Sequence, residues 1–317
     1  EDIDLKLILE SRFLLEKYFT FLLPKNKYLK CGLDKMYLYK CLEKNKNLKK
    51  FLPLTLSIDQ FISRNEVSNE INNYAKKKKW VIKPKSGSGS IGVKYLTNNE
   101  LLKSITNLMN PDEYLIQDFL DKNSITYCAT IFLNRSNNVC SYLLHKRVYE
   151  YPIKGGPSTQ RESVFNFELI NYSIEILKYL KWEGIAMLEW KHVLDQDKYY
   201  LIEINPRPGG SIVLDEKTNS QILLNYCRHF QKPNSQRNYD EINPYYKLNV
   251  KSTWMIPGDF LRYFSMSKSK RENFKDFLKA QYYCEEFALD DVKGFIGILI
   301  CQLILLFKPS TWKYLSR

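Results

Sequence analysis

Two glutamates and an asparagine occupy positions from which their side chains could form one oxygen-rich site. Glu189 and Glu203 lie in two apolar stretches separated by a polar turn, and a hairpin that turns about Gln196 places them opposite each other. Asn205 lies two residues beyond Glu203 and therefore projects from the same face of its strand. Magnesium prefers oxygen ligands of this kind, and its charge would relieve the repulsion between the carboxylates. The alternative is a solvated hairpin whose acids are incidental.

A glycine-rich loop at residues 86–92 is preceded on an apolar strand by Lys83. The backbone N–H groups of such a loop can cover phosphates, and a lysine on an apolar strand needs an anionic partner, which a nucleotide phosphate would supply. A strand rather than a helix follows the loop, which excludes a dinucleotide fingerprint, and the Lys-Ser/Thr pair of a P-loop is missing. Kinases place their lysine after the loop and need downstream motifs that are absent here. The alternative for Lys83 is a surface lysine.

Strands and helices succeed one another along the chain in a pattern that predicts an α+β fold. The predicted strands are 80–84, 92–96, 114–120, 125–133, 139–148, 184–190 and 199–205. The predicted helices are 1–30, 34–47, a polar helix that carries the basic run 76–79, and 165–180, whose apolar stripe is interrupted by Ser173. The polar, glycine-rich segment 149–162 predicts a mobile lid, with a plain surface loop as the alternative.

Taken together, several of these motifs resemble the ATP-grasp superfamily in order and approximate spacing. The motifs are Asp34-Lys35, Lys83-Pro84, the loop Ser86 to Gly92, Gln117-Asp118-Phe119-Leu120, Glu189 and Glu203-Ile204-Asn205-Pro206-Arg207. The resemblance covers roughly residues 34–230, in the carboxylate-amine ligase and carbamoyl-phosphate-synthetase-like branch. It implies a fold in which two α+β subdomains clasp ATP.

The resemblance also implies roles for individual residues. Lys35 and Lys83 would hold phosphates under the loop formed by Ser86, Gly87, Ser88, Gly89, Ser90 and Gly92. The hinge Gln117, Asp118, Phe119 and Leu120 would meet adenine through backbone groups. Magnesium, or manganese, would be held by Glu189, Glu203 and Asn205, and Arg207 would act with Lys83 in catalysis. The acyl substrate would lie near Lys154, Gly155, Gly156, Ser158, Arg161, Gly209 and Gly210.

Two departures from the family pattern affect these expectations. Family members usually carry a small βαβ domain before the first lysine, whereas residues 1–33 predict only a remnant or a truncated segment. The hinge begins with Gln117 where glutamate is common, which puts a side-chain contact to adenine in doubt. The predicted subdomains are 34–120, with the loop and hinge, and 121–258, with the metal site, followed by a helical appendage at 259–317.

The implied reaction transfers the γ-phosphoryl group of ATP to a carboxylate, and an amine then attacks the acyl phosphate. The acid and amine are expected to be small molecules or sugar-linked, because the C-terminal tail vaguely resembles those of ATP-grasp proteins encoded with surface-polysaccharide genes. The alternatives are phosphorylation of a small acid, and a basic protein that binds nucleotide or nucleic acid without catalysis. We expect no nucleic acid partner, since the aromatic residues lie in apolar elements rather than among the lysines.

Composition sets the outer limits of these interpretations. Hydrophobic residues make up 44% of the 317-residue chain, which excludes global disorder, and 48 Lys and Arg against 35 Asp and Glu give a net charge of +13. The seven cysteines form no CxxC pair, which favours reduced thiols in a cytoplasmic protein. The uncharged run 294–307 predicts a helix that is too short to span a bilayer. We expect this helix to pack against the catalytic module or a second subunit of a homodimer, with peripheral membrane contact as the alternative.

Overall fold

The computed structural model describes residues 2–67, 79–87, 89, 91–106, 110–120, 123–153, 155–231, 245–280, 284–287 and 291–308. The chain forms two compact units, each made of several chain segments. The first unit comprises residues 1–142, 166–209 and 222–242, and the second comprises 143–165, 210–221 and 243–317. All of the predicted phosphate and metal residues lie in the first unit.

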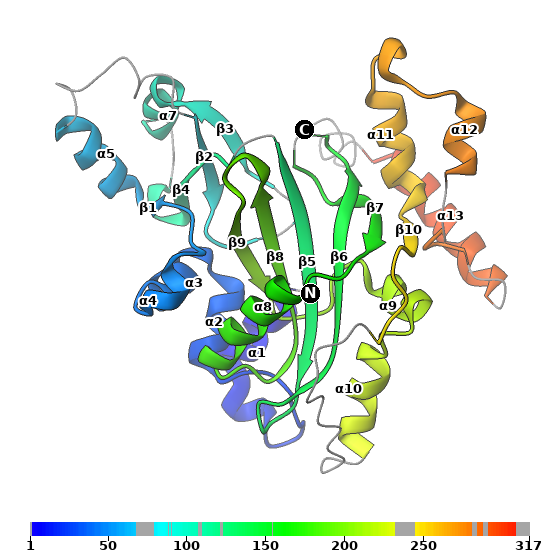
Figure 1. Ribbon diagram of the computed structural model, residues 1–317, viewed down its shortest axis with the longest axis horizontal. Helices are drawn as coiled ribbons and strands as arrows, with labels where there is room; N and C mark the ends of the chain where they lie inside the picture. The colour runs from blue at the N-terminus through cyan, green and yellow to red at the C-terminus, as the bar shows by residue number, and fades with distance from the viewer. Residues whose placement is uncertain are drawn as a thin grey trace. The chain divides into compact units, whose positions relative to one another are not determined.

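A small four-stranded sheet in the first unit carries the glycine loop (Figure 1). Its strand order is β1-β4-β2-β3, with β1 at Thr55–Leu56, β2 at Lys79–Pro84, β3 at Lys94–Thr97 and β4 at Tyr114–Asp118. Helices α5 (Ile58–Val67) and α7 (Asn98–Ile105) pack on one face, where Phe61, Trp80 and Leu101 belong to a buried cluster. A short 3-10 helix, η2 (Pro111–Glu113), leads into β4. Strand alternation leaves the opposite face for polar side chains.

The larger sheet has the strand order β10-β7-β6-β5-β8-β9, and its part in the first unit is built on long antiparallel strands. These are β5 (Ser124–Leu133), β8 (Gly184–Val193) and β9 (Lys198–Asn205), with the 3-10 turn η3 (Leu194–Gln196) between β8 and β9. Helix α8 (Phe167–Tyr179) packs against these strands. Its Ser173 accepts a 3.0 Å hydrogen bond from Trp190 Nε1, which explains the polar residue in its apolar stripe. Helix α10 (Ile222–Gln231) completes the unit.

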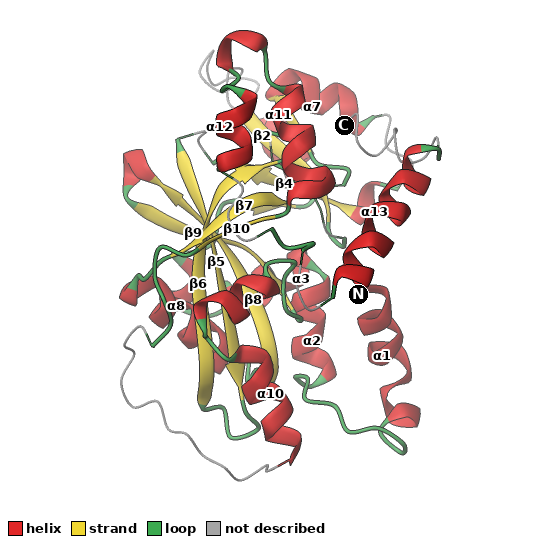
Figure 2. Cartoon of the chain, turned by 90° about the vertical axis from the view of Figure 1, so that its right-hand side faces the viewer, coloured by secondary structure: helices red, strands yellow, loops and turns green. Residues whose placement is uncertain are grey.

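Four helices open the chain where one long helix and one shorter helix were predicted. They are α1 (Asp2–Leu15), α2 (Asn26–Leu33), α3 (Lys35–Leu42) and α4 (Lys46–Lys49). The predicted helix over 1–30 is wrong, because the chain breaks before Pro24 and returns, so that α1 and α2 lie side by side (Figure 2) around Leu5, Leu29 and Leu33. Asp34 caps the N-terminus of α3, since its carboxylate accepts the N–H of Tyr37 at 2.9 Å.

Among its described residues, the second unit contains two strands that the sequence pattern did not reveal, next to the predicted strand 139–148. β6 (Val139–Glu150) begins in the first unit and continues into the second, where it pairs with β7 (Ser158–Ser163), and β7 pairs with β10 (Lys251–Thr253). The lid predicted over 149–162 is therefore reduced to a connection at residues 151–157 between two strands. Strand β7 escaped prediction because all six of its residues, Ser-Thr-Gln-Arg-Glu-Ser, are polar.

Short helices complete the second unit, as the predicted helical C-terminal region requires. They are α9 (Ile212–Thr218), η4 (Met255–Asp259), α11 (Phe260–Ser265), η5 (Lys268–Lys270), α12 (Phe274–Lys279) and α13 (Val292–Leu306). The sequence predicts that the last helix packs against the catalytic module or a second subunit. Its described apolar side chains are largely exposed, with Ile300 at 52% and Leu303 at 59%, which contradicts packing against the catalytic module, while packing against a second subunit stays a prediction. Among the described residues, no helix is long and apolar enough to cross a membrane.

Candidate functional site

Lys83 is a buried cation on the polar face of the small sheet. Strand β2 directs Trp80 and Ile82 into the core with α5 and α7, so the alternate position directs Lys83 to the other face. Its side chain is only 6% exposed, and Nζ donates a 2.9 Å hydrogen bond to the neutral amide oxygen of Gln117. Burial, reinforced by the charge of Lys35, lowers the pKa of Lys83 to about 7, although Glu203 and Glu189 oppose the shift. An anion bound beside Lys83 would therefore stabilise its charged form.

Gln117 links this lysine to the rest of the unit. Its Nε2 donates to the hydroxyls of Tyr39 and Thr55, both at 2.9 Å, and Tyr39 in turn donates to the carbonyl of Ile202 at 2.6 Å. The Gln117 side chain is 3% exposed, and it holds Lys83 instead of pointing into open space. This geometry gives a physical reason for glutamine at the hinge: an uncharged side chain can accept from a lysine and donate to two hydroxyls at once.

Lys35 joins the glycine loop to the predicted metal residues. It is the first residue of α3, and its Nζ lies 2.8 Å from the carbonyl oxygen of Gly87 and 3.2 Å from Glu203 Oε2. The backbone N–H of Lys35 also donates to the carbonyl of Lys85 at 2.9 Å. Gly87 has a φ of +113°, a value that favours glycine, so the loop bends in a way that few other residues allow. These contacts place the two predicted phosphate-binding elements together.

Glu189 and Glu203 face each other across β8 and β9, as the hairpin arithmetic predicted. The register near the turn pairs Val193 with Lys198, and an unbroken ladder from there would set Glu189 opposite Ile202 instead. A bulge between Glu189 and Trp190 inserts Ile202 as an extra residue, which restores the opposition of the two glutamates. The same Ile202 carbonyl accepts the Tyr39 hydroxyl. The predicted opposition of the two glutamates is thus confirmed, but it depends on this bulge and not on a regular hairpin.

Glu203 is surrounded by positive and polar groups. Asn205 Nδ2 donates to its Oε1 at 3.0 Å, while Lys35 approaches its other oxygen. Burial alone would raise the pKa of Glu203, but Lys35, the Asn205 amide and Lys83 together hold it below its ordinary value. The carboxylate is therefore ionised at neutral pH. Lys35, Gly87, Glu203 and Asn205 line one small pocket, which Lys6 of α1 also lines.

The predicted metal set fits an oxygen-binding cation. It consists of two carboxylates that face each other and an amide whose oxygen is presented when the group turns by 180°. No three His, Cys, Asp or Glu side chains gather as a metal site among the described residues, so this set of two carboxylates and one amide would need other ligands to complete a coordination shell. Lys35 supplies part of the positive charge beside Glu203 that a divalent ion would otherwise provide.

The predicted hinge begins in β4 and continues just beyond it, and Arg207 follows the end of β9. The N–H of Asp118 donates to Leu54, at 2.9 Å, and that of Phe119 to Lys79, at 3.3 Å, so both amides are used within the sheet. Arg207 follows Asn205 by two residues, and its Nη1 donates to the carbonyl of Pro208 at 3.4 Å. Leu120 and Gly209 belong to this first unit as well.

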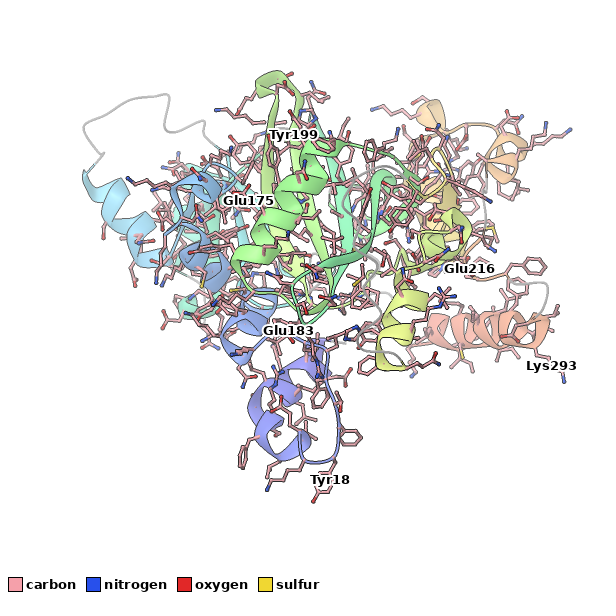
Figure 3. The ribbon with its side chains drawn as sticks, turned by 60° about the horizontal axis from the view of Figure 1, so that its bottom comes forward. Tyr18, Glu175, Glu183, Tyr199, Glu216 and Lys293 are labelled. Carbon is pink, nitrogen blue, oxygen red and sulfur yellow. The ribbon has the colours of Figure 1, made fainter. Side chains whose placement is uncertain are left out.

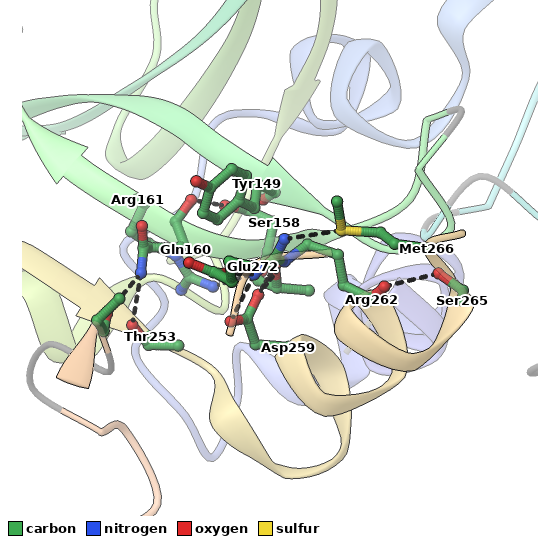
Figure 4. A network of polar contacts seen from close by, with 12 residues as sticks. Tyr149, Ser158, Gln160, Arg161, Thr253, Asp259, Arg262, Ser265, Met266 and Glu272 are labelled. Carbon is green, nitrogen blue, oxygen red and sulfur yellow. Dashed lines mark hydrogen bonds and ion pairs between the residues drawn. The ribbon is translucent and has the colours of Figure 1, made fainter. Parts of the chain in front are cut away.

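The predicted substrate residues lie mainly in the second unit. Arg161 is 4% exposed and donates to the carbonyls of Ser158 (2.6 Å) and Gly210 (3.1 Å), and it forms an ion pair with Glu285 at 2.9 Å. Figure 4 shows Arg161 beside Ser158 in this polar network. Its guanidinium is therefore occupied by protein groups, which favours a structural over a substrate-binding role.

Gly155 and Gly156, in the connection between β6 and β7, are glycines for different reasons. A Cβ on Gly156 would lie 1.9 Å from the carbonyl oxygen of Tyr151, and Gly155 has a φ of +112°. Arg147 Nη1 donates to the Gly156 carbonyl at 3.2 Å, which fixes the connection to β6. The remaining predicted residues, Ser88, Ser90 and Lys154, lie outside the described residues.

Some polar residues of the site were not predicted. Tyr39 and Thr55 hold Gln117, and Lys6 lines the pocket with the carboxylate of Glu203. Tyr39 lies four residues after Lys35 and thus on the same face of α3, which is the one sequence signal that could have indicated it. Thr55 and Lys6 carry no motif.

Comparisons with known proteins bear on this arrangement. The profile of the ATP-grasp domain family matches residues 33–211, more than half of the chain. A comparison with curated protein sequences gives no significant match.

Similar solved structures include the biotin carboxylase domain of 2-oxoglutarate carboxylase from Hydrogenobacter thermophilus, solved with MgADP, ADP and bicarbonate. It is 14% identical with a TM-score of 0.58, over 77% of this chain and 55% of that one. Biotin carboxylase from Campylobacter jejuni is 13% identical with a TM-score of 0.55, over 76% and 54%. N5-carboxyaminoimidazole synthetase from Staphylococcus aureus is 13% identical with a TM-score of 0.52, over 66% and 53%. The likeness is one of fold, and the chain spans about half the length of these proteins.

Proposed function

The chain belongs to the ATP-grasp family, and from this premise we propose that it is an ATP-dependent ligase that activates a carboxylate as an acyl phosphate for attack by an amine. The observation that carries the proposal is the buried Lys83, which is bonded to a neutral amide and has a pKa lowered to about 7. A nucleotide phosphate would supply the negative charge that this position needs. The two facing glutamates nearby supply the oxygen ligands that a metal–nucleotide complex needs.

In the proposed complex the chain's own residues mainly position the nucleotide and neutralise the charge of its phosphates. Lys83 and Lys35 hold the phosphates, Gly87 and its neighbours cover them with backbone N–H groups, and Arg207 steadies the transferring phosphoryl group. Because the amides of Asp118 and Phe119 already donate within the sheet, a backbone contact to adenine falls to Leu120 and the hinge carbonyls. Glu189, Glu203 and Asn205 would hold magnesium, which would neutralise charge on the phosphate oxygens.

The reaction balances without a protein nucleophile. A carboxylate oxygen attacks the γ-phosphorus, the bond between this phosphorus and the β,γ-bridging oxygen breaks, and ADP leaves. The amine nitrogen then attacks the acyl carbon, the bond to the phosphate oxygen breaks, and inorganic phosphate leaves as the nitrogen loses a proton. Reaction in the cytoplasm, where ATP is plentiful, is part of the proposal. A sugar-linked substrate remains a proposal that rests on the C-terminal resemblance alone.

Trapping of the acyl phosphate tests this function. The protein is incubated with ATP, magnesium and a panel of carboxylic acids, and hydroxylamine is added to convert an acyl phosphate to a hydroxamate. We expect one acid class to give both ADP release and hydroxamate. Glu203→Gln should remove most of this turnover, whereas Glu168→Gln, an exposed change on α8, should not. ADP release with no hydroxamate would point to another phosphoryl acceptor, and lack of ATP binding would overturn the assignment.

A non-enzymatic nucleic-acid-binding protein is the competing candidate, and its binding would depend differently on salt. Affinity for a polyanion falls steeply with salt because many counterions are released, while ATP contacts few cations. We therefore expect ATP to bind at a salt concentration that abolishes retention on single-stranded DNA.

A further inference from the structure

The C-terminal helix α13 exposes an unusual amount of apolar surface. Among its described side chains, those exposed by about half or more include Ile296 (50%), Ile300 (52%), Leu303 (59%) and Ile304 (54%), and Phe307 just beyond it is 87% exposed. Burying one such side chain is worth about 1.5–3 kcal/mol. Exposure of several together therefore indicates a surface that is covered by something else.

The exposed residues surround most of the helix axis. Ile296, Ile300 and Leu303 lie on one side at helical spacing, whereas Ile298 and Leu305 lie on the opposite side and are both 38% exposed. A contact within the unit touches the remaining side, where the rings of Phe287 and Phe295 are 5.2 Å apart. A second protein chain would cover one side of such a rod. Hydrocarbon chains cover all sides, which favours lipid as the occupant.

The charges of the helix suit an anionic surface. Lys293 and Lys308 mark its two ends, and residues 292–308 contain no acidic residue. Figure 3 shows Lys293 at one end of α13. The neighbouring Asp291 is the N-cap, and its carboxylate accepts the Gly294 N–H at 2.8 Å, so this acid is engaged by the helix itself. Lysines at the ends of an apolar segment extend toward lipid headgroups while their stems remain in the apolar layer.

We propose that α13 inserts into one leaflet of an anionic lipid bilayer and attaches the protein peripherally to it. The fifteen residues of the helix extend about 22 Å, which is too short to cross a hydrocarbon layer of about 30 Å. In the proposed arrangement the helix therefore stays within one leaflet, and the lysines at both of its ends reach the headgroups of that leaflet. The aliphatic side chains that become buried in lipid supply the affinity for the bilayer, and the two lysines add a preference for negative headgroups.

Vesicle co-sedimentation of the full chain tests the proposal. We expect binding to phosphatidylcholine vesicles that contain phosphatidylglycerol, with weaker binding to phosphatidylcholine alone. Ile300→Glu combined with Leu303→Glu should weaken binding by more than about tenfold. The matched control is Leu223→Glu with Leu224→Glu, which changes two exposed leucines of α10 (41% and 46%). Equal binding of the α13 variant and the unchanged chain would overturn the proposal, as would equal loss in the control.

A fluorescent probe on α13 separates insertion from adhesion elsewhere. Cys301 is exposed on the helix, and Cys227 is the other exposed cysteine, so an environment-sensitive dye can be attached to Cys301 in a Cys227→Ser background. We expect a blue shift with anionic vesicles and quenching by lipids brominated on their acyl chains. An unchanged spectrum would refute insertion. So would a dimer that forms without lipid, is broken by Ile300→Glu with Leu303→Glu, and does not bind vesicles.

Discussion

At the scale of single residues, Lys83 combines burial with a cationic side chain. Its ammonium is surrounded by protein and bonded to a neutral amide, so the folded protein bears the cost of a desolvated cation until an anion arrives. Glu203 has the opposite balance, because Lys35 and Asn205 hold it ionised. The two residues lie in the same unit, but Lys83 is buried beside a neutral amide, whereas the partly exposed Glu203 has a cation beside it.

The pH dependence of stability should report this cost. In the unfolded chain the pKa of Lys83 returns to its ordinary value of 10.5, whereas in the folded protein it is about 7. Between these values the unfolded chain binds more protons, so the free energy of unfolding should rise with pH from about 7 to 10.5. Lys83→Met should flatten this rise, and exposed Lys94→Met should preserve it. Denaturant unfolding at a series of pH values measures both, and equal slopes in the three proteins would contradict the assignment.

Nucleotide binding should reverse the shift. A phosphate beside Lys83 favours the charged ammonium and raises its pKa, so ATP binding at pH 8 should take up a proton. Calorimetric titrations in buffers with different ionisation enthalpies give the number of protons exchanged. We expect net uptake in the unchanged protein and close to none in Lys83→Met, together with weaker binding in that variant. Proton release, or uptake that persists without Lys83, would locate the titrating group elsewhere.

At the scale of elements, hydrophobic periodicity identified the strands that have apolar faces, but it missed a strand whose buried side chains are polar. Strands β2, β5 and β9 were predicted within a few residues because apolar side chains alternate or run along them. Strand β7 was missed, although Thr159, Gln160 and Arg161 are each less than 5% exposed. Their hydrogen-bond partners, such as Asp259 for Thr159, come from residues far along the chain. Local sequence contains no sign of such partners.

The site was predictable to a similar extent. Lysines, glutamates and glycines belong to motifs that can be recognised one strand at a time. The relay from Gln117 through Tyr39 to Ile202 depends on a β-bulge and on how α3 packs beside β9. Neither is encoded by a short motif, since a bulge results from the competition between two whole strand registers.

The packing of α2 against β9 provides a prediction at this scale. A Cβ on Gly32 would lie 2.8 Å from the ring of Pro206, which is too close for a rigid ring to accommodate without movement. Gly32→Ala should therefore displace α2 and, with it, Lys35, and lower both ATP affinity and stability by about 1–3 kcal/mol. Gly297→Ala on α13 is the control, because a Cβ there meets no neighbour within 4 Å. Thermal unfolding and ATP titration compare the two. Equal behaviour would show that α2 adjusts freely.

At the scale of the whole molecule, the C-terminal region is interwoven with earlier strands. Asp259 is fully buried and accepts a 2.8 Å hydrogen bond from Thr159 of β7, and Arg262 stacks on the ring of Tyr149 at 3.9 Å. Figure 4 shows Tyr149, Asp259 and Arg262 within one network of polar contacts. Farther along, Glu285 pairs with Arg161. The boundary predicted at residue 259 therefore falls inside a compact unit. Truncation can test whether the residues on its two sides fold independently.

Two shortened chains distinguish these cases. A chain that ends at residue 258 loses Asp259 and Glu285, and it leaves the buried guanidinium of Arg161 without its carboxylate, a loss that typically costs about 3–5 kcal/mol. A chain that ends at residue 290 keeps both acids and removes only α13, its N-cap Asp291 and the residues after it. We expect the longer form to unfold cooperatively near the temperature of the full chain and to bind ATP with similar affinity. The shorter form should melt well below it or aggregate. Full-length Glu285→Gln should fall between them, because an amide can accept a hydrogen bond from Arg161 but cannot balance its charge. If the chain ending at 258 instead melts with the full chain and binds ATP equally well, residues 259–317 form an independent appendage, and the buried contacts of Asp259 and Glu285 contribute little to the fold.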